Sequence, residues 1–141
     1  MDLRELLRKH LIKEVKPDKR SADELLRLAE KDISAAEDNL KTGHPDWALA
    51  IAYNAMLCAG RALMLSKGYG TNSESHHFAV VEFCASAMPS DASALVSAFN
   101  RYRIRRHDVI YGEAESVGED EAKRAIANAC AFVSRIKKMI G

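Results

Sequence analysis

The sequence has few cysteines, almost no net charge and no signal for export. Its 141 residues carry 21 lysine or arginine and 20 aspartate or glutamate side chains, a formal net charge of +1. A chain this close to neutral has no global field that attracts nucleic acid, so any such binding must depend on a local cluster. The N-terminus shows no apolar run followed by a small-residue cleavage site, so we expect no signal peptide.

The three cysteines, Cys58, Cys84 and Cys130, are odd in number and far apart, which excludes a disulfide framework. All stand among apolar residues without metal-ligand spacing, which predicts reduced core thiols of a cytoplasmic protein. The adjacent His76 and His77 do not suggest a metal site, because neighbours on a helix point about 100° apart. We therefore expect no metal and no other cofactor.

The sequence also lacks any segment with the period-two alternation of a strand. Apolar residues recur at helical spacing instead, and Pro, Gly and Ser-x-x-Glu capping boxes divide the helices from one another. The first four expected helices cover residues 3–15, 21–43, 47–66 and 76–87. A fifth includes residues 99–112, and a sixth ends at residue 140. Capping boxes at Ser21 and Ser116 are expected to open the second and the sixth helix. The second helix is expected to bury Leu25, Leu28, Ala29, Ala36 and Leu40.

The helix over residues 47–66 has almost no polar side, since Asn54 and Arg61 are the main interruptions in its apolar sequence. About twenty residues span about 30 Å, which is the thickness of a bilayer core. Alanine dominates over leucine, however, so we expect the central helix of a bundle and no membrane span. The expected fold is one all-α domain, residues 1–141: an antiparallel up-and-down bundle of about five to six helices.

Residues 99–112 concentrate polar chemistry, with four arginines, one histidine and two tyrosines. Read as a helix, this stretch places side chains spaced three, four and four apart on one face: Asn100, Arg103, His107 and Tyr111. Arg106 points toward the core side, so its permanent charge must be paired or must line a cleft. Both alternatives stay open. We expect Arg106 near Tyr53 and Arg61 of the central helix, with Asp108, Tyr111 or a carboxylate of another helix as its partner.

The order of these landmarks resembles that of the small stand-alone HEPN (higher eukaryotes and prokaryotes nucleotide-binding) proteins. Residues 52–63 resemble the usual pattern of their central helix, and Ser75-His76-His77 resembles the start of their third. Residues 103–111 are similar to an Arg-x-x-Arg-Asn-x-x-x-Tyr stretch of many members. The resemblance covers about residues 21–140 and leaves 1–17 as an N-terminal helical extension.

The resemblance implies a bundle that often dimerises and, in many members, a metal-independent ribonuclease of a toxin–antitoxin or defence system. The family signature is an arginine followed, after four to six residues, by a histidine. Arg101 has that spacing from His107 but lies about 120° away around the helix, whereas Arg103 shares the face of His107 but is one residue too close. The resemblance makes Arg103, Arg106 and His107 the candidate catalytic residues. It makes Asn100, Arg101, Arg105 and Tyr111 the candidate nucleotide- or RNA-binding residues.

The alternative is a non-catalytic HEPN domain that binds nucleotide or RNA, or docks a minimal nucleotidyltransferase. In some family pairs that partner modifies a tyrosine close to the motif, and Tyr111 is the nearest counterpart here. In either case we expect a homodimer that brings two copies of residues 99–112 to one cleft.

Overall fold

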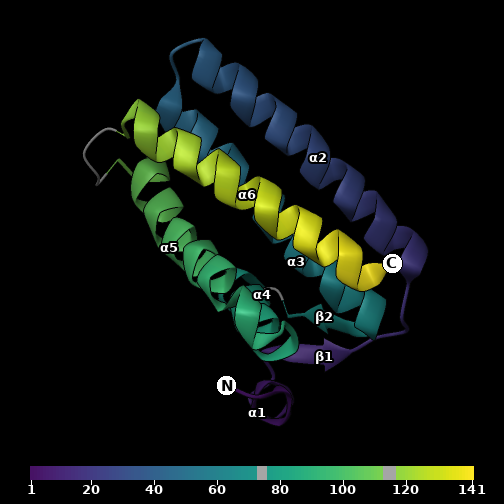
Figure 1. Cartoon of the computed structure of the whole chain (residues 1–141). Coiled ribbons are helices and arrows are strands. Elements are labelled where there is room, and N and C mark those ends of the chain that lie inside the picture. Colours follow the sequence, from purple (N-terminus) through teal and green to yellow (C-terminus); the bar gives the residue numbers. More distant parts are fainter. Residues whose placement is uncertain (73–75, 113–116) are drawn as a thin grey trace.

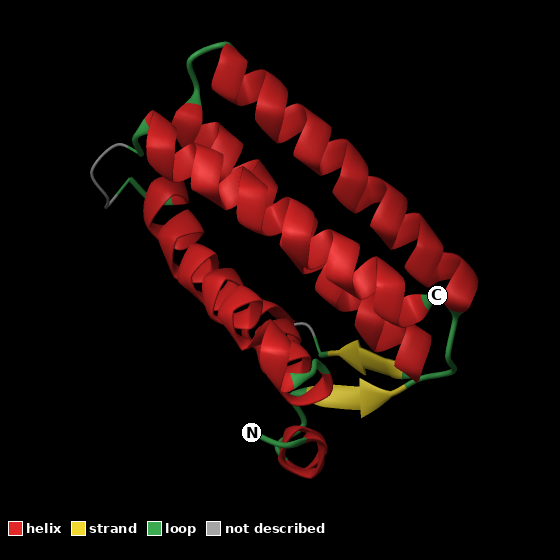
Figure 2. Ribbon diagram, viewed as in Figure 1, coloured by secondary structure: helices red, strands yellow, loops and turns green. Residues whose placement is uncertain are grey.

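The computed structural model describes residues 1–72, 76–112 and 117–141, and arranges them as a helical bundle with a two-stranded ribbon at one end (Figure 1, Figure 2). Four long helices run alternately in opposite directions: α2 (Lys19–Lys41), α3 (Pro45–Lys67), α5 (Ser93–Ile110) and α6 (Glu119–Ile140). Shorter elements complete the described chain: α1 (Leu3–Arg8), β1 (Ile12–Glu14), β2 (Tyr69–Thr71), α4 (His76–Ala87) and a 3₁₀ turn at Ser90–Ala92. The expected all-α bundle is confirmed.

The centre of the bundle is α3, which packs against α2, α4, α5 and α6. Pro45 stands in its first turn, and Gly68 ends it at φ 87°, a left-handed conformation that glycine adopts without strain. By length and composition alone α3 could cross a membrane, but 78% of its most apolar window is buried inside the protein. Its apolar surface therefore forms the core, as expected.

Gly60 allows α4 to approach α3 closely. A Cβ atom at this position would lie 2.6 Å from Cγ1 of Val80 and 3.2 Å from Sγ of Cys84, both on α4. Real Cβ atoms essentially never come within 3.0 Å of a neighbour, so this contact requires glycine. The close approach fixes the position of α4, whose first turn carries His77.

The expected N-terminal helix over residues 3–15 is wrong in its extent. The helix ends at Arg8, and His10 then takes a positive φ of 57°. Residues 12–14 instead pair antiparallel with β2, with Ile12 opposite Thr71 and Glu14 opposite Tyr69. Three residues are too few to show a period of two in the sequence, which explains why the ribbon was not expected.

The expected cap of α2 is also corrected. The helix begins at Lys19, and its N-cap is Asp18, whose carboxylate accepts hydrogen bonds from the backbone N–H and the hydroxyl of Ser21 at 3.0 and 2.8 Å. These hydrogen bonds lower the pKa of Asp18. Ser116 lies outside the described residues, and the N-cap of α6 is Gly118.

Two expectations about burial are wrong. Leu28 is 49% exposed on α2, and Cys130 is exposed on α6, whereas Cys58 and Cys84 are buried as expected. Apolar character alone does not settle burial on a helix at the edge of a bundle, because the width of the covered stripe depends on where the neighbouring helices lie.

Candidate functional site

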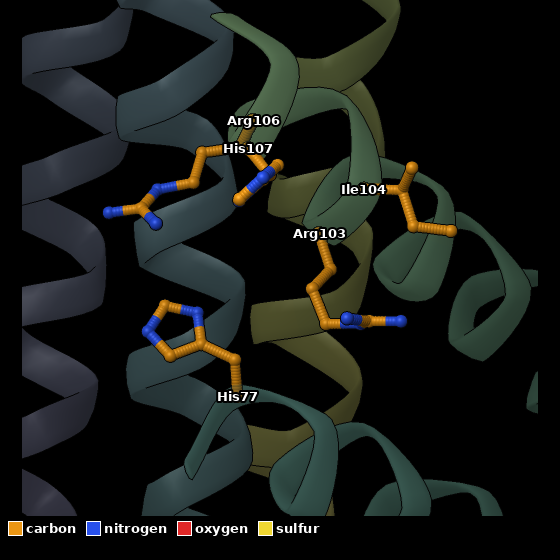
Figure 3. A pocket seen from close by; sticks show the side chains of 5 residues that line it. All are labelled: His77, Arg103, Ile104, Arg106 and His107. Carbon is orange, nitrogen blue, oxygen red and sulfur yellow. The ribbon is translucent and has the colours of Figure 1, made fainter. Parts of the chain in front are cut away.

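A pocket of about 360 Å³ opens between the first turn of α4 and the C-terminal half of α5 (Figure 3). We call it the α4–α5 pocket, and it is lined by His77, Arg103, Ile104, Arg106 and His107. Two arginines and two histidines thus line one small space, and the described residues that line it include no carboxylate. Such a set of side chains favours an anion of the size of a phosphate.

The core packing of α5 decides which of its side chains reach the pocket. Phe99 and Tyr102 are buried, and this orientation places Arg103 and His107, one helical turn apart, on the pocket side. Nε of Arg103 donates to Oδ1 of Asn100 at 3.0 Å, and the Arg103 guanidinium carbon lies 5.7 Å from the centroid of the Phe78 ring on α4. Arg103 is therefore held from both helices.

Arg106 is half-buried, and its guanidinium carbon lies 6.0 Å from the centroid of the Tyr53 ring, at the limit of a cation–π contact. The expected partner, Asp108, Tyr111 or a carboxylate of another helix, is not found among residues 1–72, 76–112 and 117–141. Of the two open alternatives, the structure therefore supports a cleft-lining arginine over a satisfied ion pair. Tyr53 lies near it as expected, whereas Arg61 lines a separate hollow with Lys13 and Tyr69.

Two lining residues were not predicted as part of the site, the apolar Ile104 and the polar His77. Nδ1 of His77 lies 2.8 Å from the hydroxyl oxygen of Tyr53, and the two rings stack with centroids 5.7 Å apart and an interplanar angle of 26°. Burial, followed by the positive charge of Arg106, lowers the pKa of His77 below its ordinary value. No sequence spacing links residue 77 to residue 103, because the packing of α4 on α5 brings them together.

Tyr111 is not a lining residue of the pocket, but its ring lies against that of His107, which is one. Their ring centroids are 4.6 Å apart at 44°, and the side chain of Tyr111 is 65% exposed beyond the last turn of α5. An exposed aromatic side chain beside a cationic pocket is the arrangement that lets an unpaired base stack.

None of the four predicted binding residues is itself a lining residue: Asn100 and Tyr111 contact the lining residues Arg103 and His107, whereas the other two make their contacts elsewhere. Nε and Nη2 of Arg105 donate to the carboxylate of Glu121 on α6 at 2.9 and 3.1 Å. Arg101 is exposed, with its guanidinium carbon 5.0 Å from the Tyr102 ring. The structure therefore brings Arg103, Arg106 and His107 together and places Arg101 and Arg105 elsewhere on α5. The part of the chain that the structure describes also contains no group of three His, Cys, Asp or Glu side chains that could hold a metal ion.

Comparison with known proteins relates this arrangement to a described family. The family model of the HEPN domain matches residues 22–139. The crystal structure of TT1696 from Thermus thermophilus is similar with a TM-score of 0.66 and 22% sequence identity, over 83% of this chain and 96% of that chain. That likeness shows a shared fold. No match is found among curated proteins.

Proposed function

The chain belongs to the HEPN domain family, and on that premise we propose that it is a metal-independent endoribonuclease of a toxin–antitoxin or defence type. The observation that carries this proposal is the α4–α5 pocket, which is lined by two arginines and two histidines and has no carboxylate among its described lining residues. The substrate we propose is single-stranded RNA, since the exposed ring of Tyr111 lies against His107 of the pocket, where an unpaired base can stack.

Cleavage without a metal uses the ribose 2′-hydroxyl of the RNA itself. Its oxygen attacks the adjacent phosphorus while the bond from phosphorus to the 5′ oxygen of the next nucleotide breaks, leaving a 2′,3′-cyclic phosphate and a 5′-hydroxyl. One proton leaves the 2′ oxygen and one is delivered to the 5′ oxygen. An imidazole performs both kinds of transfer near neutral pH.

In this proposal the side chains divide the work by their positions. Arg103 and Arg106 bind the scissile phosphate and stabilise the negative charge that builds on its oxygens. His107, one turn after Arg103 and exposed at the mouth, is the proton-transfer group. Tyr111, in ring contact with His107, stacks on a base next to the cleaved bond.

The test is cleavage of a labelled single-stranded RNA in EDTA by the wild-type protein and by His107→Ala. Loss of a general acid–base group lowers the rate by about a hundred- to ten-thousand-fold, and we expect a loss in that range with an unchanged circular dichroism spectrum. Arg101→Ala is the matched control, because Arg101 is exposed on the same helix outside the pocket. An inactive wild-type protein, or a His107→Ala protein of full activity, would contradict the proposal.

The exposure of Tyr111 favours a second candidate function. Its phenol is 65% exposed beside His107, within reach of a partner protein. In this alternative the pocket binds RNA or nucleotide without cleavage, and a nucleotidyltransferase partner modifies the Tyr111 hydroxyl. Salt-dependent RNA binding by a wild-type protein that does not cleave would favour this function.

A further inference from the structure

One side of the His77 ring contacts the buried Tyr53, and the other side faces the α4–α5 pocket. Tyr53 is 1% exposed, and its hydroxyl oxygen lies 2.8 Å from Nδ1 of His77. The Tyr53 and His77 rings also stack with an interplanar angle of 26°, and this contact fixes the orientation of the imidazole plane. Figure 3 shows the His77 ring directed from α4 toward the side of the pocket on which Arg106 and His107 of α5 lie. With Nδ1 engaged by Tyr53, the nitrogen that remains for a ligand in the pocket is Nε2.

The hydrogen bond also determines which nitrogen carries the proton. Burial raises the pKa of Tyr53 above its ordinary value, so the hydroxyl keeps its hydrogen. Within the described chain, His77 Nδ1 is the hydrogen-bond partner of that hydroxyl. A buried donor without an acceptor is destabilising, so the Tyr53 hydroxyl donates and Nδ1 accepts. A neutral imidazole that accepts at Nδ1 carries its hydrogen on Nε2.

We propose that His77 is a neutral Nε2–H donor to a non-bridging oxygen of the bound phosphate, and that Tyr53 is the positioning residue that holds this tautomer. The inference deepens the proposed function and rests on it, since it specifies how the phosphodiester is bound. It gives the two histidines of the pocket different tasks: His107 transfers protons, and His77 donates a hydrogen bond without changing charge.

The charges around His77 support a neutral ring. Burial lowers its pKa below the ordinary value of 6.5, and the positive charges on three elements act in the same direction. These charges belong to Arg106 and Arg103 on α5, His76 on α4 and Arg61 on α3. A third cation beside the two arginines would be repelled by both, whereas a neutral N–H adds a hydrogen bond at no such cost. His107 is the other titratable group that lines the pocket.

The first experiment measures the tautomer directly. Long-range ¹H–¹⁵N spectra of the full-length protein at pH 7, with His77 assigned through His77→Gln, should show an unprotonated Nδ1 and a protonated Nε2. Tyr53→Phe keeps the ring and removes the hydroxyl, so it should shift His77 toward a mixture of the two tautomers. A protonated Nδ1 in the wild-type protein, or a Tyr53→Phe spectrum identical to wild type, would overturn the inference.

The second experiment asks whether the donor matters for the ligand. The side-chain amide of glutamine keeps an N–H near the position of Nε2, whereas leucine removes it at similar volume. We expect His77→Leu to weaken binding of inorganic phosphate and cleavage of RNA by about ten- to a hundred-fold, and His77→Gln to stay within a few-fold of wild type. Equal losses in the two variants, with both folded by circular dichroism, would overturn the inference.

The two experiments separate this inference from the proposed function. If the wild-type protein cleaves RNA and His77→Leu cleaves it equally well, the proposed function stands and the inference fails. If the wild-type protein does not cleave RNA, the proposed function fails, and the tautomer spectra and phosphate affinities still decide whether His77 is the neutral donor. Phosphate binding that protonates His77 to an imidazolium would also overturn it.

Discussion

Gly60 shows how one absent methyl group positions the pocket. In Gly60→Ala the new Cβ would lie 2.6 Å from Cγ1 of Val80, so α3 and α4 must separate or side chains must leave their rotamers. Overpacking of this kind costs about 1–3 kcal/mol, while alanine gains about 1 kcal/mol of helix propensity over glycine. We expect a net decrease in the free energy of unfolding of up to about 2 kcal/mol, measured by urea denaturation.

The matched control is the double variant Gly60→Ala/Val80→Ala, in which the colliding methyl group is absent. Its destabilisation should be smaller than the sum of the two single changes, because the two residues are in contact. A Gly60→Ala protein more stable than wild type would show that helix propensity outweighs the close approach.

At the same scale, the sequence predicts the part of the site that lies on one helix. Spacings of three and four residues place Arg103 and His107 on one face of α5 wherever the helix packs, and the structure has them lining one pocket. His77 and Tyr53 come from α4 and α3, so their meeting depends on tertiary packing. The pairing of Arg105 with Glu121 likewise depends on the position of α6.

Among the elements, α1 and β1 lie before the family match, which begins at residue 22, yet they contribute to the core. Leu6 on α1 is 0% exposed, and the next residue, Leu7, is half-buried. We expect Leu6→Ala to lower the free energy of unfolding by about 2–5 kcal/mol, the usual range for a buried leucine. Leu7→Ala, the matched control, should cost less than half as much in the same urea titration.

Equal effects of the two leucine substitutions would contradict this prediction, because they would show that the burial of Leu6 does not set its contribution to stability. The expected difference would show instead that the segment before residue 22 supports α4 and β2, because α1 packs against α4 and β1 pairs with β2.

The long helices were predictable because each contains several turns of a periodic apolar pattern and ends near a proline or a glycine. α3 and α6 run close to their expected limits. The ribbon was not predictable, because β1 and β2 have only three residues each and are stabilised by pairing with one another. In the sequence, the whole of α2 and α3 separates the two strands. Local pattern cannot reveal a structure whose stabilising partner is distant in sequence.

At the scale of the whole molecule, the exposed side of α5 leads us to predict self-association. Ile104 is 51% exposed, and Ile110 and Tyr111 follow it on the surface at 42% and 65%. We expect a homodimer at micromolar concentration in which two α5 helices lie near each other. In a two-fold interface each substitution acts twice, so Ile104→Glu should weaken association by at least about tenfold in sedimentation experiments.

The matched control is Leu28→Glu, which places the same charge on α2 at a side chain of nearly equal exposure, 49%. This variant should sediment as the wild-type protein does. A wild-type protein that sediments only as a monomer would contradict the prediction, and equal weakening by both variants would place the contact elsewhere.

The unequal burial of the three cysteines makes the unmodified chain suitable for spectroscopy. Cys58 and Cys84 are enclosed, whereas Cys130 is exposed beside Ile33 and Val133 in a shallow groove of α2 and α6. A thiol-reactive spin label or fluorophore therefore has one natural attachment point, on elements that do not line the α4–α5 pocket. Partial burial raises the pKa of the Cys130 thiol, so coupling will proceed faster in mildly alkaline buffer. In an assembly of two chains, the label-to-label distance would report how the copies are oriented without any engineered cysteine.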